Sequence, residues 1–255
     1  TEPGAGSDAG AVSCRAEKVE GGYILNGTKC FITNAPIADK ITLFANTREG
    51  GGIRGLTVFL VDADTKGISI GKEEDKMGIR ASATAEIIFE DCFVPDSARV
   101  GKEGRGFMIA MQTLQMSRPV VAAISVGIAQ AAIEAAVAYS HHRKQFGVKI
   151  ATFEMVQQMI ADMVMKTEAA RILTYKACVA QMNKDKKAGL YSAMSKCFAS
   201  DTAMEVTTTA VQVMGGNGYS RENPVEKYMR DAKIMQIYEG TNQVQRLVIA
   251  NETTF

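Results

Sequence analysis

The chain changes its residue pattern near residue 100, and this change limits the folds that it can adopt. Before this point, three short runs are rich in β-branched and aromatic residues, at positions 41–45, 56–61 and 87–89. Turn-forming residues separate them, and no helical pattern lies between them to serve as a crossover. We therefore predict a compact antiparallel barrel or sandwich in this part of the chain. Residues 23–33 add a strand-like pattern, in which Asn26-Gly27 predicts a hairpin turn.

Beyond Gly104 the pattern is helical. Apolar residues recur at helical spacing, and glycine and proline residues divide the pattern into segments. Helices are predicted over residues 106–142, 153–182, 188–214, 224–235 and 240–251. Pro119 lies inside the first segment and is expected to kink or divide it. Because the three long helices have short connections, they predict an antiparallel bundle.

Charge and cysteine usage exclude several classes of function. Lys and Arg number 29 against 28 Asp and Glu, so the formal charge is +1 and gives no basic field for nucleic acid. The five cysteines are scattered without a CxxC pair, so no metal site or disulfide framework is indicated, and a reducing compartment fits best. No apolar run approaches the roughly 18–20 residues that span a bilayer, so no membrane segment is expected.

Three segments carry residues suited to ligand binding or catalysis. Gly4–Gly10 has the spacing GxGxxxG with no helical pattern after it, so it is either a backbone cradle for a pyrophosphate or a surface turn. Met214–Tyr219 holds three glycines between two predicted helices, where a ligand can approach the backbone closely. Glu239 precedes a predicted helix beside Gly240, and is either a positioned general base or a charge that complements the helix dipole.

Read together, eight segments resemble the acyl-CoA dehydrogenase family, the flavoproteins that oxidise fatty acyl-CoA thioesters. Each motif alone has low specificity, and their common order along the whole chain carries the resemblance. The motifs are Thr1-Glu-Pro-Gly-Ala-Gly-Ser-Asp8, Phe31-Ile-Thr-Asn34, Met77-Gly-Ile-Arg80, Phe89-Glu-Asp91 with Val94-Pro95, Arg143-Lys-Gln-Phe-Gly147, Gln212-Val-Met-Gly-Gly-Asn-Gly218, Met229-Arg-Asp-Ala-Lys233 and Gln236-Ile-Tyr-Glu-Gly-Thr241.

The resemblance implies an α+β fold in which an antiparallel β-barrel domain precedes an antiparallel four-helix bundle. The barrel would comprise residues 1–100 and bind the flavin. The bundle would comprise residues 101–255 and supply the catalytic base and an oligomer interface. Members of the family also have an N-terminal helical domain, and no segment of this sequence resembles it.

The resemblance further assigns residues to FAD, some of them to the cofactor of a neighbouring subunit. Phe31 stands where many relatives have Trp, and Glu154 stands where Gln is usual, beside Phe153. The FAD-binding residues that the resemblance implies are Thr1, Ser7, Phe31, Ile32, Thr33, Arg143, Gln145, Phe153, Gln212, Val213, Met214, Gly215, Gly216, Gly240, Thr241, Asn242 and Gln243. The implied substrate-binding residues are Ser7, Arg118 and Gly240.

Glu239 falls on the catalytic-base position of the straight-chain members. The implied mechanism is removal of an α proton by Glu239 as a β hydride passes to the flavin. The Glu239 backbone N–H and a ribityl hydroxyl would polarise the thioester oxygen. Some branched-chain and long-chain relatives carry the base at the position that matches Ser117. Serine supplies no carboxylate there, so the resemblance favours Glu239.

The implied function is α,β-dehydrogenation of short- or medium-chain acyl-CoA thioesters to trans-2-enoyl-CoA, with electrons passed to electron-transfer flavoprotein. A homotetramer or homodimer is expected, in the bacterial cytoplasm or the mitochondrial matrix. Two alternatives stay open. One is an acyl-CoA oxidase, which peroxide release in air would reveal, and the other is a non-catalytic flavin- or acyl-CoA-binding module.

Overall fold

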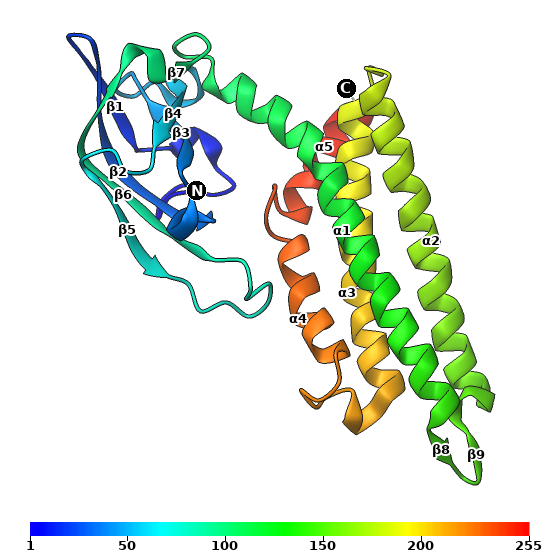
Figure 1. The fold of residues 1–255 in the computed structure, drawn as a ribbon. Coiled ribbons are helices and arrows are strands. Elements are labelled where there is room, and N and C mark those ends of the chain that lie inside the picture. The colour runs from blue at the N-terminus through cyan, green and yellow to red at the C-terminus, as the bar shows by residue number, and fades with distance from the viewer. Residues whose placement is uncertain (255) are drawn as a thin grey trace. The chain divides into compact units, whose positions relative to one another are not determined.

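A computed structural model describes residues 1–254 of the chain (Figure 1). The chain divides into two compact units, which we call the sheet unit and the helical unit. The sheet unit comprises residues 1–76 and 80–113. The helical unit comprises residues 77–79 and residues 114 onward. The chain therefore has an α+β fold, with strands and long helices segregated along the sequence.

The sheet unit holds one seven-stranded sheet within the described residues, in the order β5-β6-β2-β1-β3-β4-β7. Most neighbouring strands are antiparallel, as predicted from the lack of a helical crossover between them. The strands are β1 (Arg15–Val19), β2 (Gly22–Thr33), β3 (Lys40–Asn46), β4 (Leu56–Asp62), β5 (Ile68–Glu73), β6 (Thr84–Pro95) and β7 (Arg99–Val100).

The predicted antiparallel barrel needs two corrections. First, β1 and β3 pair in parallel, through Arg15 and Asn46. β2 runs opposite to β1, and β3 turns back after β2 on the far side of β1, so β3 points the same way as β1. Second, the sheet is open in the described residues, with β5 and β7 at its edges. The two-residue strand β7 pairs only with β4 and is too short to close the ring.

The Asn26-Gly27 pair does not form the predicted hairpin turn. It lies inside β2, and the turn between β1 and β2 is at Glu20-Gly21 instead. Asn26 Oδ1 accepts a hydrogen bond from the Asp91 N–H at 2.8 Å, which shifts the register against β6. A Cβ on Gly27 would lie 2.8 Å from Cys14 Cα, so glycine is needed here for close strand approach rather than for a turn.

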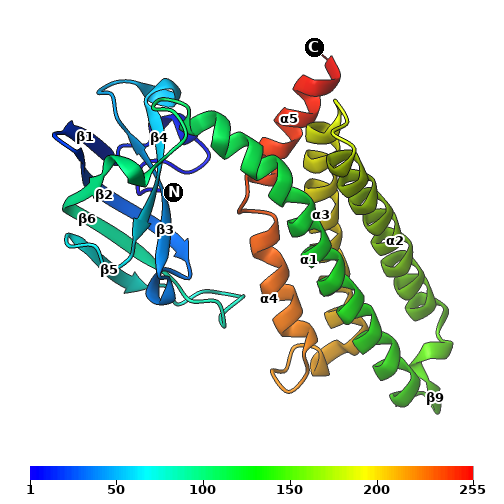
Figure 2. The same cartoon turned by 45° about the horizontal axis from the view of Figure 1, so that its top comes forward.

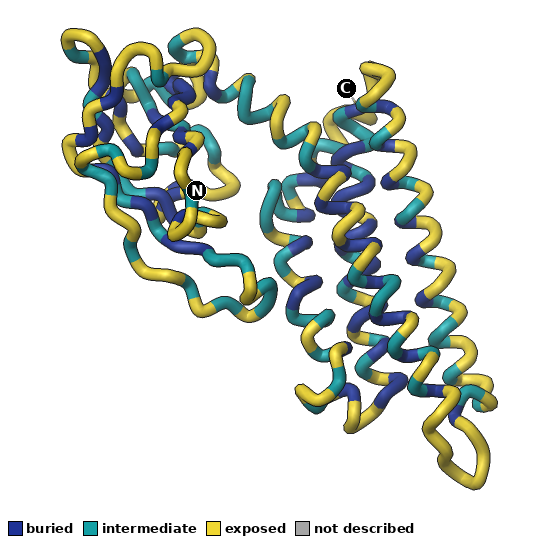
Figure 3. Tube along the Cα trace, viewed as in Figure 1, coloured by how far each residue is buried: buried dark blue, intermediate teal, exposed yellow. Residues whose placement is uncertain are grey.

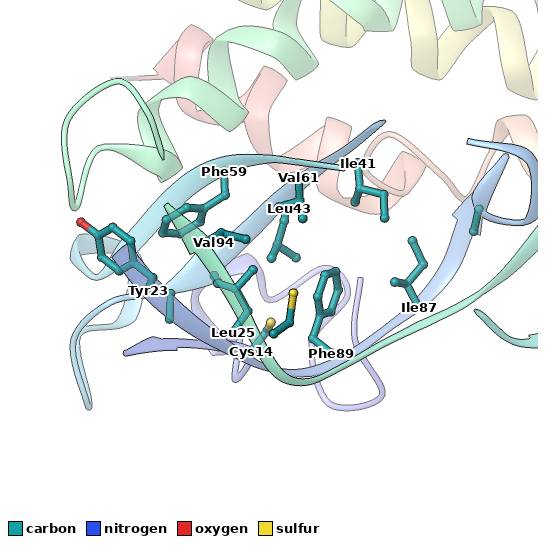
Figure 4. Packing of buried hydrophobic residues seen from close by; sticks show 14 of the residues in the cluster. Cys14, Tyr23, Leu25, Ile41, Leu43, Phe59, Val61, Ile87, Phe89 and Val94 are labelled. Atoms are coloured by element: carbon teal, nitrogen blue, oxygen red, sulfur yellow. The ribbon is translucent and has the colours of Figure 1, made fainter. Parts of the chain in front are cut away.

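The core of the sheet unit consists of side chains from alternate positions on the strands (Figures 3 and 4). Tyr23 and Leu25 of β2 point inward with Leu43 of β3 and Phe59 of β4. The rings of Tyr23 and Phe59 meet edge to face, with centroids 5.0 Å apart. This alternation is the period-two pattern of strands with one buried face.

The helical unit is built on α3, which contacts α2, α4 and α5 (Figures 1 and 2). The helices of the described residues are α1 (Gly106–His142), α2 (Glu154–Met182), α3 (Ala188–Met214), α4 (Val225–Met235) and α5 (Asn242–Thr254). The hairpin β8 (Lys144–Gln145) and β9 (Val148–Lys149) connects α1 to α2. The predicted helix ranges are confirmed closely. The implied four-helix bundle is wrong in its number of helices, because the described residues form five. The shorter α4 adds Val225 and Ala232 to the same apolar core as the long helices.

Pro119 does not divide α1, which is a single helix of 37 residues. Proline lacks the N–H that would bond the carbonyl four residues earlier, here that of Gln115. The side-chain amide of Gln181 on α2 donates to that carbonyl at 2.9 Å. The orphaned acceptor is therefore satisfied by a neighbouring helix, and α1 continues through the proline.

Helix α1 also corrects the expectation that no stretch is apolar enough to span a membrane. Among the described residues it is the one helix whose length and composition pass that test. About 44% of the apolar window is buried inside the structure, and the core helix of a globular bundle passes the same test. Ala129, Ala132 and Ala136 pack against α2 and α3, so burial in the bundle accounts for part of this composition.

Candidate functional site

The connection between α4 and α5, residues 236–241, presents the predicted base, and we call it the base loop. The Asn242 N–H donates to the Gln236 carbonyl at 3.0 Å and closes the loop. Glu239 and Gly240 both have positive φ, 58° and 87°. A Cβ on Gly240 would lie 2.4 Å from Gln245 Nε2, so only glycine fits there. Positive φ at Glu239 is the kind of local strain found at functional sites.

The Glu239 carboxylate is held by one hydrogen bond from α1. Ser117 Oγ donates to Glu239 Oε2 at 2.7 Å, and Glu239 itself is half-buried. Ser117 occupies the position where the resemblance places the base of other relatives. The structure thus brings the two positions into contact, although they are 122 residues apart in the chain.

Two buried cations lie behind the base loop. Arg118, expected on the substrate path, is 8% exposed, and its Nε donates to the Glu239 carbonyl at 3.4 Å. Burial lowers the pKa of Arg118, and the nearby Glu239 charge opposes this shift. Lys196 of α3 is fully buried, and this burial lowers its pKa to about 8.

Sequence reasoning missed Lys196 and Gln245, both of which contact the base loop. One signal was available for the lysine. The α3 face that includes Ser192, Ala199, Ala203 and Thr207 is small and buried, and Lys196 is the charged residue on it. A lysine on such a face predicts a buried cation with a dedicated acceptor. Gln245 gave no comparable signal.

The predicted FAD residues between Arg143 and Gly216, apart from Gln212, line one cavity of about 450 Å³ beside the β8–β9 hairpin, whose place Figure 1 shows. The predicted residues 240–243 are not among its lining residues. No Cβ on Gly215 or Gly216 would meet an atom within 4 Å, so a ligand can reach their backbone. Gln212 is exposed and is not part of the lining. The lining residues are Tyr139, Arg143, Gln145, Ile150, Phe153, Val156, Val213, Met214, Gly215, Gly216 and Asn217.

This donor set fits part of a flavin dinucleotide. Arg143 supplies a guanidinium for a phosphate, Phe153 supplies an aromatic ring for stacking, and the two glycines leave open backbone for a pyrophosphate. The predicted FAD residues do not include Tyr139 or Asn217, whose side chains are hydrogen-bonded at 2.6 Å across the lining. Their proximity arises from the tertiary fold, since they belong to α1 and to the turn after α3.

The predicted residues that follow Glu239 differ in exposure. Asn242 is buried, and its amide nitrogen donates to Asp201 Oδ1 at 2.7 Å and to Ser200 Oγ at 2.9 Å. Its side chain therefore serves the interior of the helical unit. Thr241 is half-buried and Gln243 is exposed, so these two residues remain accessible to a ligand.

The predicted flavin residues of the sheet unit form a separate group. The Cys30 N–H donates to the Thr1 carbonyl at 2.9 Å, which places Thr1 beside the end of β2 that carries residues 31–33. Phe31 has φ of 57° where the β2–β6 register shifts, and it is 63% exposed. A bulge of this kind re-aims a side chain away from the sheet, so the Phe31 ring is accessible at the surface. Ser7 is also exposed.

Comparison with known proteins identifies the family of both units. The model of the acyl-CoA dehydrogenase middle domain matches residues 1–92, and that of the acyl-CoA dehydrogenase C-terminal domain matches residues 104–253. A probable acyl-CoA dehydrogenase of Mycobacterium tuberculosis is 49% identical over 250 residues, 98% of this chain.

Two solved structures are also similar over nearly the whole chain. Butyryl-CoA dehydrogenase of Megasphaera elsdenii has a TM-score of 0.98 at 48% identity and covers all of this chain and 67% of its own. A chain in a structure described as the electron transferring flavoprotein of Acidaminococcus fermentans has a TM-score of 0.96 at 52% identity, covering 99% of this chain and 66% of its own. This chain spans 64% of the length of the Mycobacterium relative. Both family models and these relatives agree, and the chain belongs to the acyl-CoA dehydrogenase family.

Proposed function

We propose that the chain carries out α,β-dehydrogenation of acyl-CoA thioesters of short or medium chain length, with FAD as cofactor and an electron-transfer flavoprotein as acceptor. The observation that carries the proposal is the Glu239 carboxylate, presented on a strained loop and held by Ser117. The similarity to butyryl-CoA dehydrogenase supports the short chain length.

In this mechanism Glu239 removes the α proton of the thioester. Ser117 donates to Oε2 and orients the carboxylate, so Oε1 is left to accept the proton. The Glu239 backbone N–H has no hydrogen-bond partner within residues 1–254, so it is available to polarise the thioester oxygen. FAD supplies the two-electron acceptor for the reaction. Arg143, Phe153 and residues 213–216 would hold part of the cofactor in the cavity described above.

Assembly follows from the same assignment. The resemblance gives Arg143 and Gln145 to the FAD of a neighbouring subunit, so we propose that the chain acts as a homodimer or homotetramer. Size-exclusion chromatography with light scattering tests this. A monomer that binds FAD with full affinity would contradict the shared site.

The proposed function is tested by anaerobic titration of the FAD-reconstituted protein with butyryl-, octanoyl- and palmitoyl-CoA while the flavin absorption is followed. We expect bleaching with at least one thioester. Glu239→Gln should bind FAD normally and lose about 10²–10⁴ in the rate of bleaching, the usual contribution of a general base. Glu222→Gln, an exposed carboxylate on the turn before α4, is the matched control. Near-normal rates in Glu239→Gln would remove Glu239 as the base, and peroxide release in air would indicate an oxidase.

A further inference from the structure

Lys196 is a buried cation whose hydrogen-bond partners belong to the base loop and to the residue that closes it. It lies on α3 and is 0% exposed. Its ammonium donates to the Gly240 carbonyl at 2.8 Å and to Asn242 Oδ1 at 2.9 Å, and neither partner is a carboxylate. Burial of an ammonium group is costly, and an apolar side chain of the same length would avoid that cost. The two acceptors therefore indicate which segment the buried charge stabilises, namely residues 240–242.

Gln245 directs a second donor at the same stretch of backbone. Its Nε2 donates to the Glu239 carbonyl at 3.2 Å and to the Gly240 carbonyl at 3.0 Å. Its Oε1 is buried and has no hydrogen-bond partner among residues 1–254. The flipped amide would set an acceptor against two carbonyl oxygens. The two hydrogen bonds from Nε2 therefore determine the orientation of the amide, although Oε1 is left unpaired.

These two carbonyls determine the backbone that carries the carboxylate. Glu239 is in the left-handed region, which L-residues disfavour, and it is followed by Gly240 in the same region. In a trans peptide the N–H points opposite to the carbonyl. The Glu239 carbonyl accepts from Gln245 and Arg118, and the Gly240 carbonyl accepts from Lys196 and Gln245. The N–H groups of Gly240 and Thr241 therefore point away from these donors. Within the described residues these two N–H groups have no hydrogen-bond partner.

We propose that Lys196 and Gln245 form a carbonyl clamp that positions the base loop. The clamp fixes the carbonyls of Glu239 and Gly240, and so keeps Glu239 in the left-handed conformation in which its carboxylate meets Ser117. Both are positioning residues, because they act through the loop backbone and not on the reacting atoms. The catalytic consequence rests on the proposed function, whereas the conformational consequence does not.

The first test is Lys196→Met, which removes the donors and keeps an unbranched side chain. In the FAD-reconstituted full chain we expect kcat to fall at least tenfold while KM changes less than threefold. We also expect amide hydrogen exchange of the peptide 236–246 to become at least tenfold faster. The reason is that the hydrogen bond from the Asn242 N–H to the Gln236 carbonyl opens more often when Lys196 no longer holds the loop. Lys186→Met replaces an exposed lysine before α3 and is the matched control, expected to change neither quantity.

Gln245→Met is the second test, and it leaves the buried charge in place. It should change the same two quantities in the same direction by a smaller factor, and it keeps the proposal testable if Lys196→Met fails to fold. Unchanged kcat and unchanged loop exchange in the folded variants would overturn the clamp. Faster exchange spread equally over β2 and α2 would overturn it as well, since that is general destabilisation. A wild-type protein that never bleaches would refute the proposed function, while loop exchange would still decide the clamp.

Discussion

The substitution Glu2→Gln is expected to destabilise the sheet unit strongly, because Glu2 is half of a buried ion pair. The side chains of Glu2 and Lys29 are 1% and 8% exposed, and Lys29 Nζ lies 2.5 Å from Glu2 Oε1. The same carboxylate accepts hydrogen bonds from the Ser13 N–H and hydroxyl, both at 2.7 Å, and from the Cys14 N–H at 3.1 Å. Glutamine keeps the size of the side chain but leaves the Lys29 ammonium without its counter-ion.

Removal of one partner of a buried ion pair costs about 3–5 kcal/mol, most of it from the uncompensated charge that remains. Lys29 retains one acceptor, the Phe44 carbonyl at 2.6 Å, so the lower part of this range is expected. A unit of about 110 residues has a urea m value of about 1.5 kcal/mol per molar. The unfolding midpoint of the sheet unit should therefore fall by about 2 M urea.

The assay is hydrogen exchange at increasing urea concentration, read separately for peptides of β2 and of α3, because the two units need not unfold together. Glu17→Gln is the matched control, since Glu17 pairs with Arg15 at the surface and its loss should shift the midpoint very little. The double variant Glu2→Gln with Lys29→Met should recover part of the loss, because no buried charge remains. Surface effects are limited to about 0.5 kcal/mol. A β2 midpoint of Glu2→Gln within about 0.3 M of the wild-type midpoint would therefore show that the buried ion pair contributes no more than a surface contact.

The same pair predicts a dependence on pH. Burial by itself raises the pKa of Glu2, but hydrogen bonds from Lys29 and Ser13 outweigh burial and hold the pKa below its ordinary value of 4.5. A carboxyl whose pKa is lowered by folding contributes stability that is complete above its unfolded pKa. That contribution should be lost as the pH falls below 4.5 through the lowered folded pKa, and Glu2→Gln should lack this component.

Three further predictions concern the helical unit. Gly240→Ala should lower the free energy of unfolding by about 2–3 kcal/mol, because an L-residue at φ of 87° is strained and its Cβ displaces the Gln245 amide. An unchanged melting temperature would contradict this prediction. The free energy of unfolding of wild type, relative to that of Lys196→Met, should increase between pH 8 and pH 10.5. The reason is that the folded chain releases the Lys196 proton at a pKa of about 8, while the unfolded chain keeps it up to 10.5. A difference in melting temperature that is the same at pH 7.5 and pH 9.5 would contradict this prediction. Arg143→Ala should weaken FAD binding at least tenfold in equilibrium dialysis, because it removes the guanidinium of the cavity. Lys144→Ala, at the neighbouring position, is the control. Equal FAD affinities of Arg143→Ala and wild type would show that Arg143 does not bind the cofactor.

Most helices and strands were predictable from local sequence patterns. Helix α3 begins and ends where helical periodicity and Gly215 predict, because periodicity and a glycine of positive φ are local properties. The eight ordered motifs also sufficed for the family, which the comparisons confirm. Asn26-Gly27 shows the limit of local reading, since the same dipeptide that favours a turn serves here as a bulge against Asp91.

The contacts between polar groups of different elements depend on the packing of those elements. Three helices contribute the side chains that contact residues 239–240, namely Ser117 of α1, Lys196 of α3 and Gln245 of α5. Their meeting at these residues depends on how the three helices pack together. The parallel pairing of β1 with β3 arose in the same way, from the side of β1 to which the chain returned. Periodicity reports which face of an element is buried, but it carries no information on what lies opposite that face. For this reason the motif was enough to assign the proposed base, whereas the contacts of Lys196 and Gln245 with its loop could not be predicted.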